Sequence, residues 1–151
     1  MFHVKQSRLP YIQLICMRKI DKIIVHCADT PEGRDVRAEE IRRWHRAKGW
    51  NDIGYHYVID IDGTIEAGRD IECAGAHTQG QNATSIGICY VGGCDAKMQP
   101  KDTRTEAQKE SLRLLIKFLK LKYKDAKVFG HRDFAQKACP CFDAKKEYEG
   151  I

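Results

Sequence analysis

The chain has 151 residues, which fits one domain with a core large enough to need neither disulfides nor a structural metal. Its formal net charge of +5 comes from 26 basic and 21 acidic residues, a mixed balance that favours polyanionic surroundings without requiring nucleic acid. The seven cysteines are odd in number and scattered, which argues against a small disulfide-stabilised secreted protein and favours synthesis in a reducing compartment.

The amino-terminal region carries an apolar run, Tyr11–Cys16, that is too short for a membrane span. The run contains Gln13 and is followed by Arg18 without a small-residue cleavage pattern, so a signal peptide is also rejected. We expect residues 1–16 to form a loosely attached arm or an over-extended start, and residues 17–151 to form the functional domain. The protein is therefore expected to be made in a reducing compartment without a signal peptide.

Strands and helices alternate along the rest of the chain. A β-branched run that ends at His26 predicts a buried strand whose last side chain emerges at the end of a sheet. A helix is predicted to follow, with Asp35 as its cap and Gly49 as its stop. That helix is expected to pack through Ile41 and Trp44.

An Asp-Gly turn joins residues 55–59 to residues 64–67 and predicts a β-hairpin. Residues 73–85 are predicted to form an irregular loop. Residues 86–91 then predict a further strand, in which Gly87 indicates close backbone approach.

Thr105 opens a capping box, and apolar residues at helical spacing then predict the longest helix. The short run 127–130 predicts a returning strand, which delivers His131 beside His26 if it lies next to the first strand. Without repeats or linkers, the pattern predicts a single α/β domain with a central mixed sheet flanked by helices.

His26, His131 and Cys139 offer imidazole nitrogen and thiolate sulfur, the atoms that hold zinc in sites with three protein ligands and one open position for a reactive water. Such a site would make the chain a hydrolase. The intervals lack the short fixed spacing of a strong metal motif. A histidine that ends an apolar strand is commonly a hydrogen-bonded core or edge residue, and a single cysteine is commonly a small buried hydrophobe.

Six ordered stretches resemble one family, the zinc-dependent N-acetylmuramoyl-L-alanine amidases of the bacteriophage lysozyme type, which are related to the peptidoglycan recognition proteins. The resemblance extends from about Lys22 to about Lys145. The stretches are Ile24–Ala28, Gly54–Tyr57, Asp62–Arg69, Gly75–His77 with Asn82, Ser85–Gly87 and Lys137–Pro140.

The resemblance implies hydrolysis of the amide bond between N-acetylmuramic acid and the L-alanine of the stem peptide. It implies an endolysin of a phage or prophage, made in the cytoplasm of the host bacterium and acting on the cell wall. It implies a zinc cleft on one side of the sheet, with His26, His131 and Cys139 as the zinc ligands. Tyr55 and Lys137 match the residues that active members need for turnover.

The chemistry of amide hydrolysis suggests roles for Lys137 and Tyr55. An ammonium near the scissile carbonyl stabilises its developing negative charge, which makes Lys137 the expected oxyanion donor, although a solvated lysine is the ordinary alternative. Tyr55, with an unperturbed pKa near 10, is expected to orient the attacking water rather than act as a base. His77 and Asn82 lie in the loop that matches the family's substrate cleft, so the resemblance implies that they bind substrate, although a surface histidine is the alternative for His77. His45, on the predicted helix, is a further candidate for substrate binding.

Cys141 departs from the family pattern because it places a second thiol two residues beyond Cys139. It could compete for zinc or form a disulfide with Cys139, so activity is predicted to be sensitive to oxidants and restored by reductant plus zinc. Cys27 is expected to be a core residue on the opposite face of its strand from His26.

Two other classes of function remain open. One is a peptidoglycan-binding recognition module of the same fold without turnover, and the other is a regulatory protein that binds another macromolecule through its basic surface. A glycosidase would need a positioned carboxylate pair, and none stands out. We expect a monomer that binds Zn²⁺ and peptidoglycan, without nucleic acid or membrane as partners.

Overall fold

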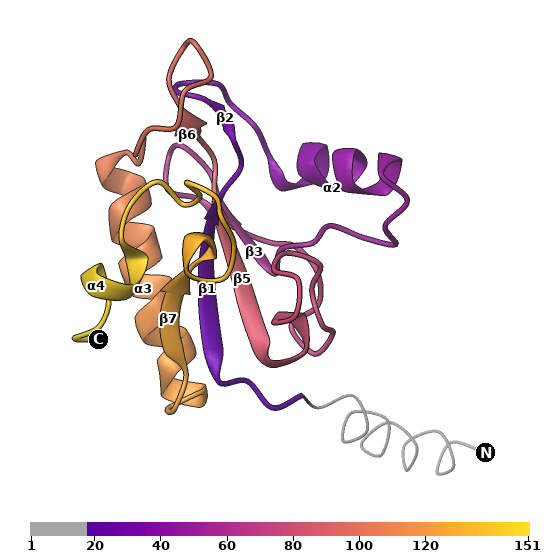
Figure 1. Ribbon diagram of the computed structural model, residues 1–151, viewed down its shortest axis with the longest axis vertical. Coiled ribbons are helices and arrows are strands. Elements are labelled where there is room, and N and C mark those ends of the chain that lie inside the picture. The colour runs from indigo at the N-terminus through magenta and orange to yellow at the C-terminus, as the bar shows by residue number, and fades with distance from the viewer. Residues whose placement is uncertain (1–17) are drawn as a thin grey trace.

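The computed structural model describes residues 18–151, so the expectation for residues 1–16 lies outside the described residues. The elements in chain order are β1 (Lys22–Cys27), β2 (Thr30–Pro31), α2 (Ala38–Ala47), β3 (Tyr57–Ile59), β4 (Ile65–Ala67), β5 (Ser85–Tyr90), β6 (Gly93–Cys94), α3 (Glu106–Lys122), β7 (Lys127–Gly130) and α4 (Ala144–Glu147) (Figure 1). Short 3₁₀ turns cover Asn82–Thr84 and His131–Asp133. Within the described residues, no helix is both long and apolar enough to span a membrane.

The central sheet has the strand order β4-β3-β5-β1-β7. Strands β1, β3, β5 and β7 run parallel, and β4 is antiparallel to β3, which confirms the predicted hairpin and the mixed sheet. Strand β7 pairs directly with β1, with Val25 opposite Gly130, which confirms that residues 127–130 lie beside the first strand. A separate two-stranded sheet of β2 and β6 was not predicted, because two-residue strands carry no periodicity.

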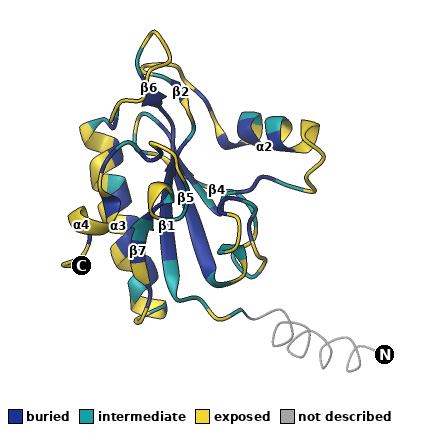
Figure 2. Ribbon diagram, viewed as in Figure 1, coloured by how far each residue is buried: buried dark blue, intermediate teal, exposed yellow. Residues whose placement is uncertain are grey.

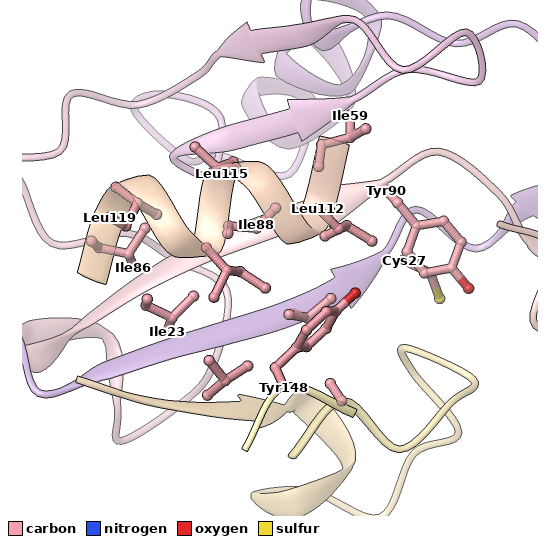
Figure 3. Packing of buried hydrophobic residues seen from close by; sticks show 14 of the residues in the cluster. Ile23, Cys27, Ile59, Ile86, Ile88, Tyr90, Leu112, Leu115, Leu119 and Tyr148 are labelled. Carbon is pink, nitrogen blue, oxygen red and sulfur yellow. The ribbon is translucent and has the colours of Figure 1, made fainter. Parts of the chain in front are cut away.

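Helix α3 covers one face of the sheet (Figure 1). Its capping box is present as predicted, with the Thr105 side chain accepting from Gln108 N and the Gln108 side chain accepting from Thr105 N. Leu112, Leu115 and Leu119 pack onto alternate residues of β1 and β5 (Figure 3). The central strands β1 and β5 are buried along nearly their whole length (Figure 2).

Helix α2 belongs to a second apolar cluster, in which Ile41 packs with Val58 and Val91. The prediction that Asp35 caps this helix was wrong. The helix begins at Ala38, and its N-cap residue, Arg37, makes no side-chain capping hydrogen bond. A partner distant in sequence satisfies the first turn instead, since Glu66 Oε1 on β4 accepts from Ala38 N at 3.0 Å. An N-cap is thus supplied by tertiary structure rather than by the local sequence.

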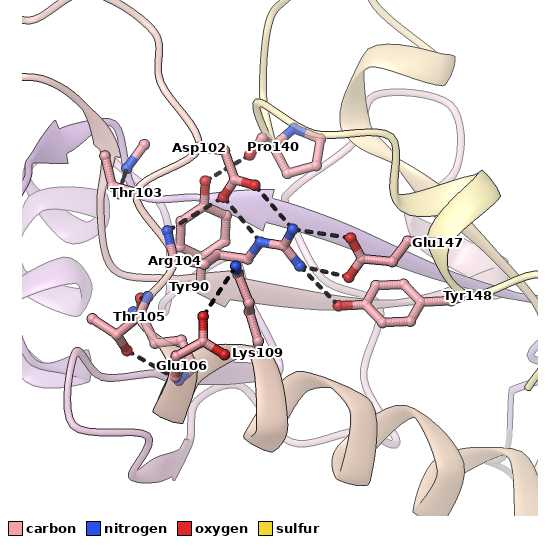
Figure 4. A network of polar contacts seen from close by, with 12 residues as sticks. Tyr90, Asp102, Thr103, Arg104, Thr105, Glu106, Lys109, Pro140, Glu147 and Tyr148 are labelled. Carbon is pink, nitrogen blue, oxygen red and sulfur yellow. Dashed lines mark hydrogen bonds and ion pairs between the residues drawn. The ribbon is translucent and has the colours of Figure 1, made fainter.

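A buried arginine fastens the carboxyl-terminal segment to the loop that precedes α3 (Figure 4). Arg104 pairs with Asp102 at 2.9 Å and Glu147 at 2.7 Å, and its guanidinium lies 3.3 Å from the ring centroid of Phe142. Nearby, the hydroxyl of Tyr90 donates to the carbonyl of Pro140 at 2.7 Å. These contacts hold the chain immediately after Cys139.

Candidate metal centre and active site

The alternation of side chains along β1 separates the core from the site. Ile23, Val25 and Cys27 belong to the cluster that includes α3, so Cys27 is a core residue as predicted. Because successive side chains of a strand point to opposite faces, His26 lies on the other face. It is 1% exposed there and stands at the carboxyl end of the strand.

The three predicted ligands meet at this edge of the sheet. His131 follows β7 directly, and the parallel pairing of β7 with β1 brings it to within 4.6 Å of His26 between ring centroids. Cys139 comes from the following loop, and its sulfur lies 3.9 Å from Nδ1 of His26. One ligand atom from each of the three residues lies within 4.8 Å of the others.

This donor set suits a metal ion such as zinc. With Zn–N and Zn–S bonds of about 2.0 to 2.3 Å, tetrahedral ligand atoms lie roughly 3.3 to 3.8 Å apart, so a small contraction of the trio reaches bonding geometry. Burial, followed by the charges of His77 and His131, lowers the pKa of His26 well below its usual value. Burial, followed by Lys137, lowers the pKa of His131, so both imidazoles are neutral at neutral pH, as metal ligands must be.

Two adjoining cavities of about 380 and 490 Å³ form a cleft over these residues, and His77, His131 and Lys137 line both. Trp50 also lines both cavities, and no motif in the sequence identified it. The cleft is large enough to hold a small molecule, and it opens beside the three predicted metal-binding residues.

Tyr55 and Lys137 lie at the cleft. Tyr55 precedes β3, and its ring centroid is 5.1 Å from that of His26. Burial, followed by the neighbouring thiols, raises the pKa of Tyr55 well above its usual value, so its hydroxyl stays protonated and can donate a hydrogen bond. Lys137 is exposed, and its positive charge reaches both His26 and His131.

The predicted substrate-binding residues occupy distinct places. His45 on α2 lines the smaller cavity and accepts from Gly54 N through Nδ1 at 2.8 Å. Asn82 lines the larger cavity, and its Oδ1 accepts from the backbone N–H groups of His77 and Thr78, both at 2.9 Å. His77 contacts the cleft, but its two ring nitrogens face His26 and Ser85 at the floor.

Cys141 turns toward Cys27 rather than into the cleft. Its sulfur lies 4.0 Å from the sulfur of Cys27 and donates to the carbonyl of Gly93 at 3.3 Å. Within residues 18–151, no disulfide joins two cysteines.

Residues 17–142 match the protein family described as N-acetylmuramoyl-L-alanine amidase. The chain is 46% identical over 138 residues to the endolysin of Klebsiella phage KP32, with 91% of each chain covered. It is 47% identical over 129 residues to the endolysin of Escherichia phage T7, with 85% of each chain covered. Among solved structures, it resembles N-acetylmuramoyl-L-alanine amidase LysC from Clostridium intestinale URNW, with a TM-score of 0.73 and 29% identity over 87% of this chain and 83% of that one.

Two imidazoles and a thiol that meet at the end of a mixed sheet, beside an open cleft, match the ligand set of metal-dependent hydrolases. With the match over residues 17–142 and relatives above 45% identity, the chain belongs to the N-acetylmuramoyl-L-alanine amidase family.

Proposed function

We propose that the protein is an endolysin-type amidase that hydrolyses the bond between N-acetylmuramic acid and L-alanine in peptidoglycan, with one zinc ion held by His26, His131 and Cys139. The observation that carries this proposal is the convergence of these three side chains from β1, the end of β7 and the following loop. The family match and the endolysin relatives support the same reaction and the same substrate.

When bound, zinc supplies Lewis acidity that polarises a carbonyl and lowers the pKa of a coordinated water to about 7. Tyr55 keeps its proton at neutral pH, so it donates a hydrogen bond that orients the attacking water or the substrate carbonyl. Lys137, on the loop that carries Cys139, brings an ammonium to the carbonyl oxygen as negative charge develops there. Losing such a donor costs about 2.7 to 4 kcal/mol of barrier.

The walls of the cleft bind and orient the muramyl peptide. Within residues 18–151, neither Nε2 of His45 nor the side-chain amide nitrogen of Asn82 has a hydrogen-bond partner, so both can donate to polar groups of the substrate. Trp50 offers an apolar surface against which a sugar ring or a peptide side chain can pack.

The test is digestion of purified peptidoglycan by the wild type, the zinc-stripped protein and Lys137→Ala, followed by mass spectrometry of the released stem peptides. We expect new L-alanine amino termini with the zinc-loaded wild type and a rate about 10²-fold lower with Lys137→Ala. Lys97→Ala, in an exposed loop away from the cleft, is the matched control and should retain the wild-type rate. New reducing sugar ends would indicate a glycosidase, and binding without any cleavage would indicate a recognition module.

A further inference from the structure

The ring of His77 packs tightly against the backbone at two glycines. A Cβ on Gly87 of β5 would lie 2.6 Å from Cγ and Cδ2 of this ring, and a Cβ on Gly75 would lie 2.6 Å from Cδ2. Two glycines therefore make a fitted space for one imidazole that is 8% exposed. A histidine held so closely has a fixed ring orientation, and its two nitrogens point to fixed partners.

These partners form a chain of hydrogen bonds with one direction. The carbonyl of Gln81 can only accept, so the hydroxyl of Ser85, at 2.7 Å, donates to it. The oxygen of Ser85 then accepts from Nε2–H of His77 at 3.3 Å, which leaves Nδ1 of His77 as an acceptor. Nδ1 in turn accepts from Nε2–H of His26 at 2.9 Å. The remaining nitrogen of His26, Nδ1, carries a lone pair and faces the sulfur of Cys139.

The reverse order of donors and acceptors would leave Nε2 of His77 without a donor. If His77 carried its proton on Nδ1, its Nε2 would need a donor, but the hydroxyl hydrogen of Ser85 is already engaged with Gln81. Thr78 does not decide the direction, because its hydroxyl lies 2.9 Å from Nδ1 of His77 and 3.2 Å from Nε2 of His26 and can donate to one or accept from the other. The backbone carbonyl of Gln81, which can only accept, therefore fixes the direction of all the hydrogen bonds from Ser85 to His26.

We propose that Ser85 and His77 are positioning residues that fix the proton of His26 on Nε2 and thereby present the lone pair of Nδ1 to the metal. This proposal rests on the proposed function in one respect only, which is that His26, His131 and Cys139 bind a metal ion. Outer-shell partners of ligating histidines commonly fix the tautomer in this way, usually through a carboxylate or a carbonyl, and their loss typically costs 10- to 100-fold in metal affinity. In this protein, His77 and Ser85 connect His26 to the backbone carbonyl of Gln81, which fixes the tautomer.

The first test uses the wild-type protein without metal and needs no variant. Long-range ¹H–¹⁵N correlation spectra of the ¹⁵N-labelled protein report which nitrogen of each histidine carries the proton. The proposal expects Nε2–H for both His26 and His77. Finding Nδ1–H on His77 would overturn it, whatever the protein does to peptidoglycan.

The second test measures zinc affinity by competition with a chromophoric chelator under reducing conditions. Ser85→Ala removes the acceptor of His77, so we expect zinc to bind 10- to 100-fold more weakly and the spectra to show a mixture of His77 tautomers. Ser111→Ala is the matched control, because it removes another serine hydroxyl that donates to a backbone carbonyl, on α3 and away from the cleft. If both variants bind zinc as the wild type does, the positioning role is disproved.

The two proposals fail in different ways. Nε2–H tautomers and weakened zinc binding in Ser85→Ala would support the positioning role even if no stem peptide were released. Conversely, amidase activity together with unaltered zinc affinity in Ser85→Ala would retain the proposed function and reject the role of Ser85 and His77.

Discussion

The buried carboxylate of Asp60 lies against that of Glu66, between the hairpin and the start of α2. One oxygen of Asp60 accepts from Arg37 at 2.7 Å, whereas within residues 18–151 the other, Oδ1, has no donor. Burial, followed by the hydrogen bond and charge of Glu66, raises the pKa of Asp60 to about 7. We therefore expect a proton held between the two carboxyl groups to supply the missing donor.

This carboxyl pair predicts a pH-dependent stability. The unfolded chain loses the Asp60 proton near pH 3.8, whereas the folded protein keeps it to about pH 7. The stabilisation of the folded protein by this proton is therefore fully present below about pH 4 and is lost as the pH rises to 7. Relative to Asp60→Asn, the wild-type free energy of unfolding should fall by roughly 2 to 4 kcal/mol across this window, since tenfold in proton affinity is worth about 1.4 kcal/mol.

Urea denaturation of both proteins between pH 4 and pH 8 measures this difference. Asp62→Asn, at an exposed turn position, serves as the control and should not show the same slope. Parallel curves for the wild type and Asp60→Asn would contradict the shared proton.

Arg104 is predicted to anchor the carboxyl-terminal segment through a buried charge. Its side chain is 3% exposed, and Arg104→Met leaves Asp102 and Glu147 without their partner. Breaking a buried ion pair on one side costs about 3 to 5 kcal/mol, and the partial exposure of both carboxylates places the expected loss near 3 kcal/mol. Arg113→Met removes an exposed pair with Glu110 and should cost less than about 1 kcal/mol. Equal denaturation midpoints for the two variants would rule out the anchor.

Oxidation is predicted to inactivate the enzyme through Cys141, and reductant plus zinc is predicted to restore it. The sequence points to a disulfide with Cys139, and the structure offers Cys27 as a second partner at 4.0 Å. Burial, followed by Cys27, raises the pKa of Cys141 to about 12, so the reaction should be slow at neutral pH and faster in alkali.

Peptide mapping by mass spectrometry after oxidation would distinguish the two disulfides. Cys141→Ser should resist inactivation, whereas Cys73→Ser, which replaces an exposed cysteine, should remain sensitive. Full activity in a sample shown to be oxidised at Cys141 would refute the prediction.

The sequence predicted the parts of the molecule that rest on local periodicity and on motifs. The capping box at Thr105 is a contact between neighbours in sequence, and it was correctly placed. The cap of α2 was misplaced because Glu66, its actual acceptor, lies 28 residues away from Ala38. The same limit applies to the site. The ordered motifs include both His26 and Ser85, but they give Ser85 no role, because its link to His26 through His77 is a contact of the folded protein.

Metal removal is predicted to lower thermal stability as well as activity. A ligand that binds only the folded protein stabilises it by about 2.7 kcal/mol when its free concentration is 100 times its Kd. Dialysis against a chelator should therefore lower Tm, and zinc added back under reducing conditions should restore it. His131→Ala should show no zinc-dependent rise, because it removes one of the three donors. A zinc-dependent rise that persists in His131→Ala would place the metal elsewhere.

Tyr55 is predicted to act as a hydrogen-bond donor in turnover without contributing to metal binding. Tyr55→Phe removes the protonated hydroxyl and keeps the ring beside His26, so kcat should fall by about 10²-fold while the zinc Kd is unchanged. Tyr57→Phe is the matched control, because that ring packs with the core cluster that includes α3 and should leave both quantities unaltered. The measurement pairs the initial rate of stem-peptide release with chelator competition. A parallel loss of zinc affinity in Tyr55→Phe would assign Tyr55 to the metal site instead, and a wild-type kcat would remove it from the mechanism.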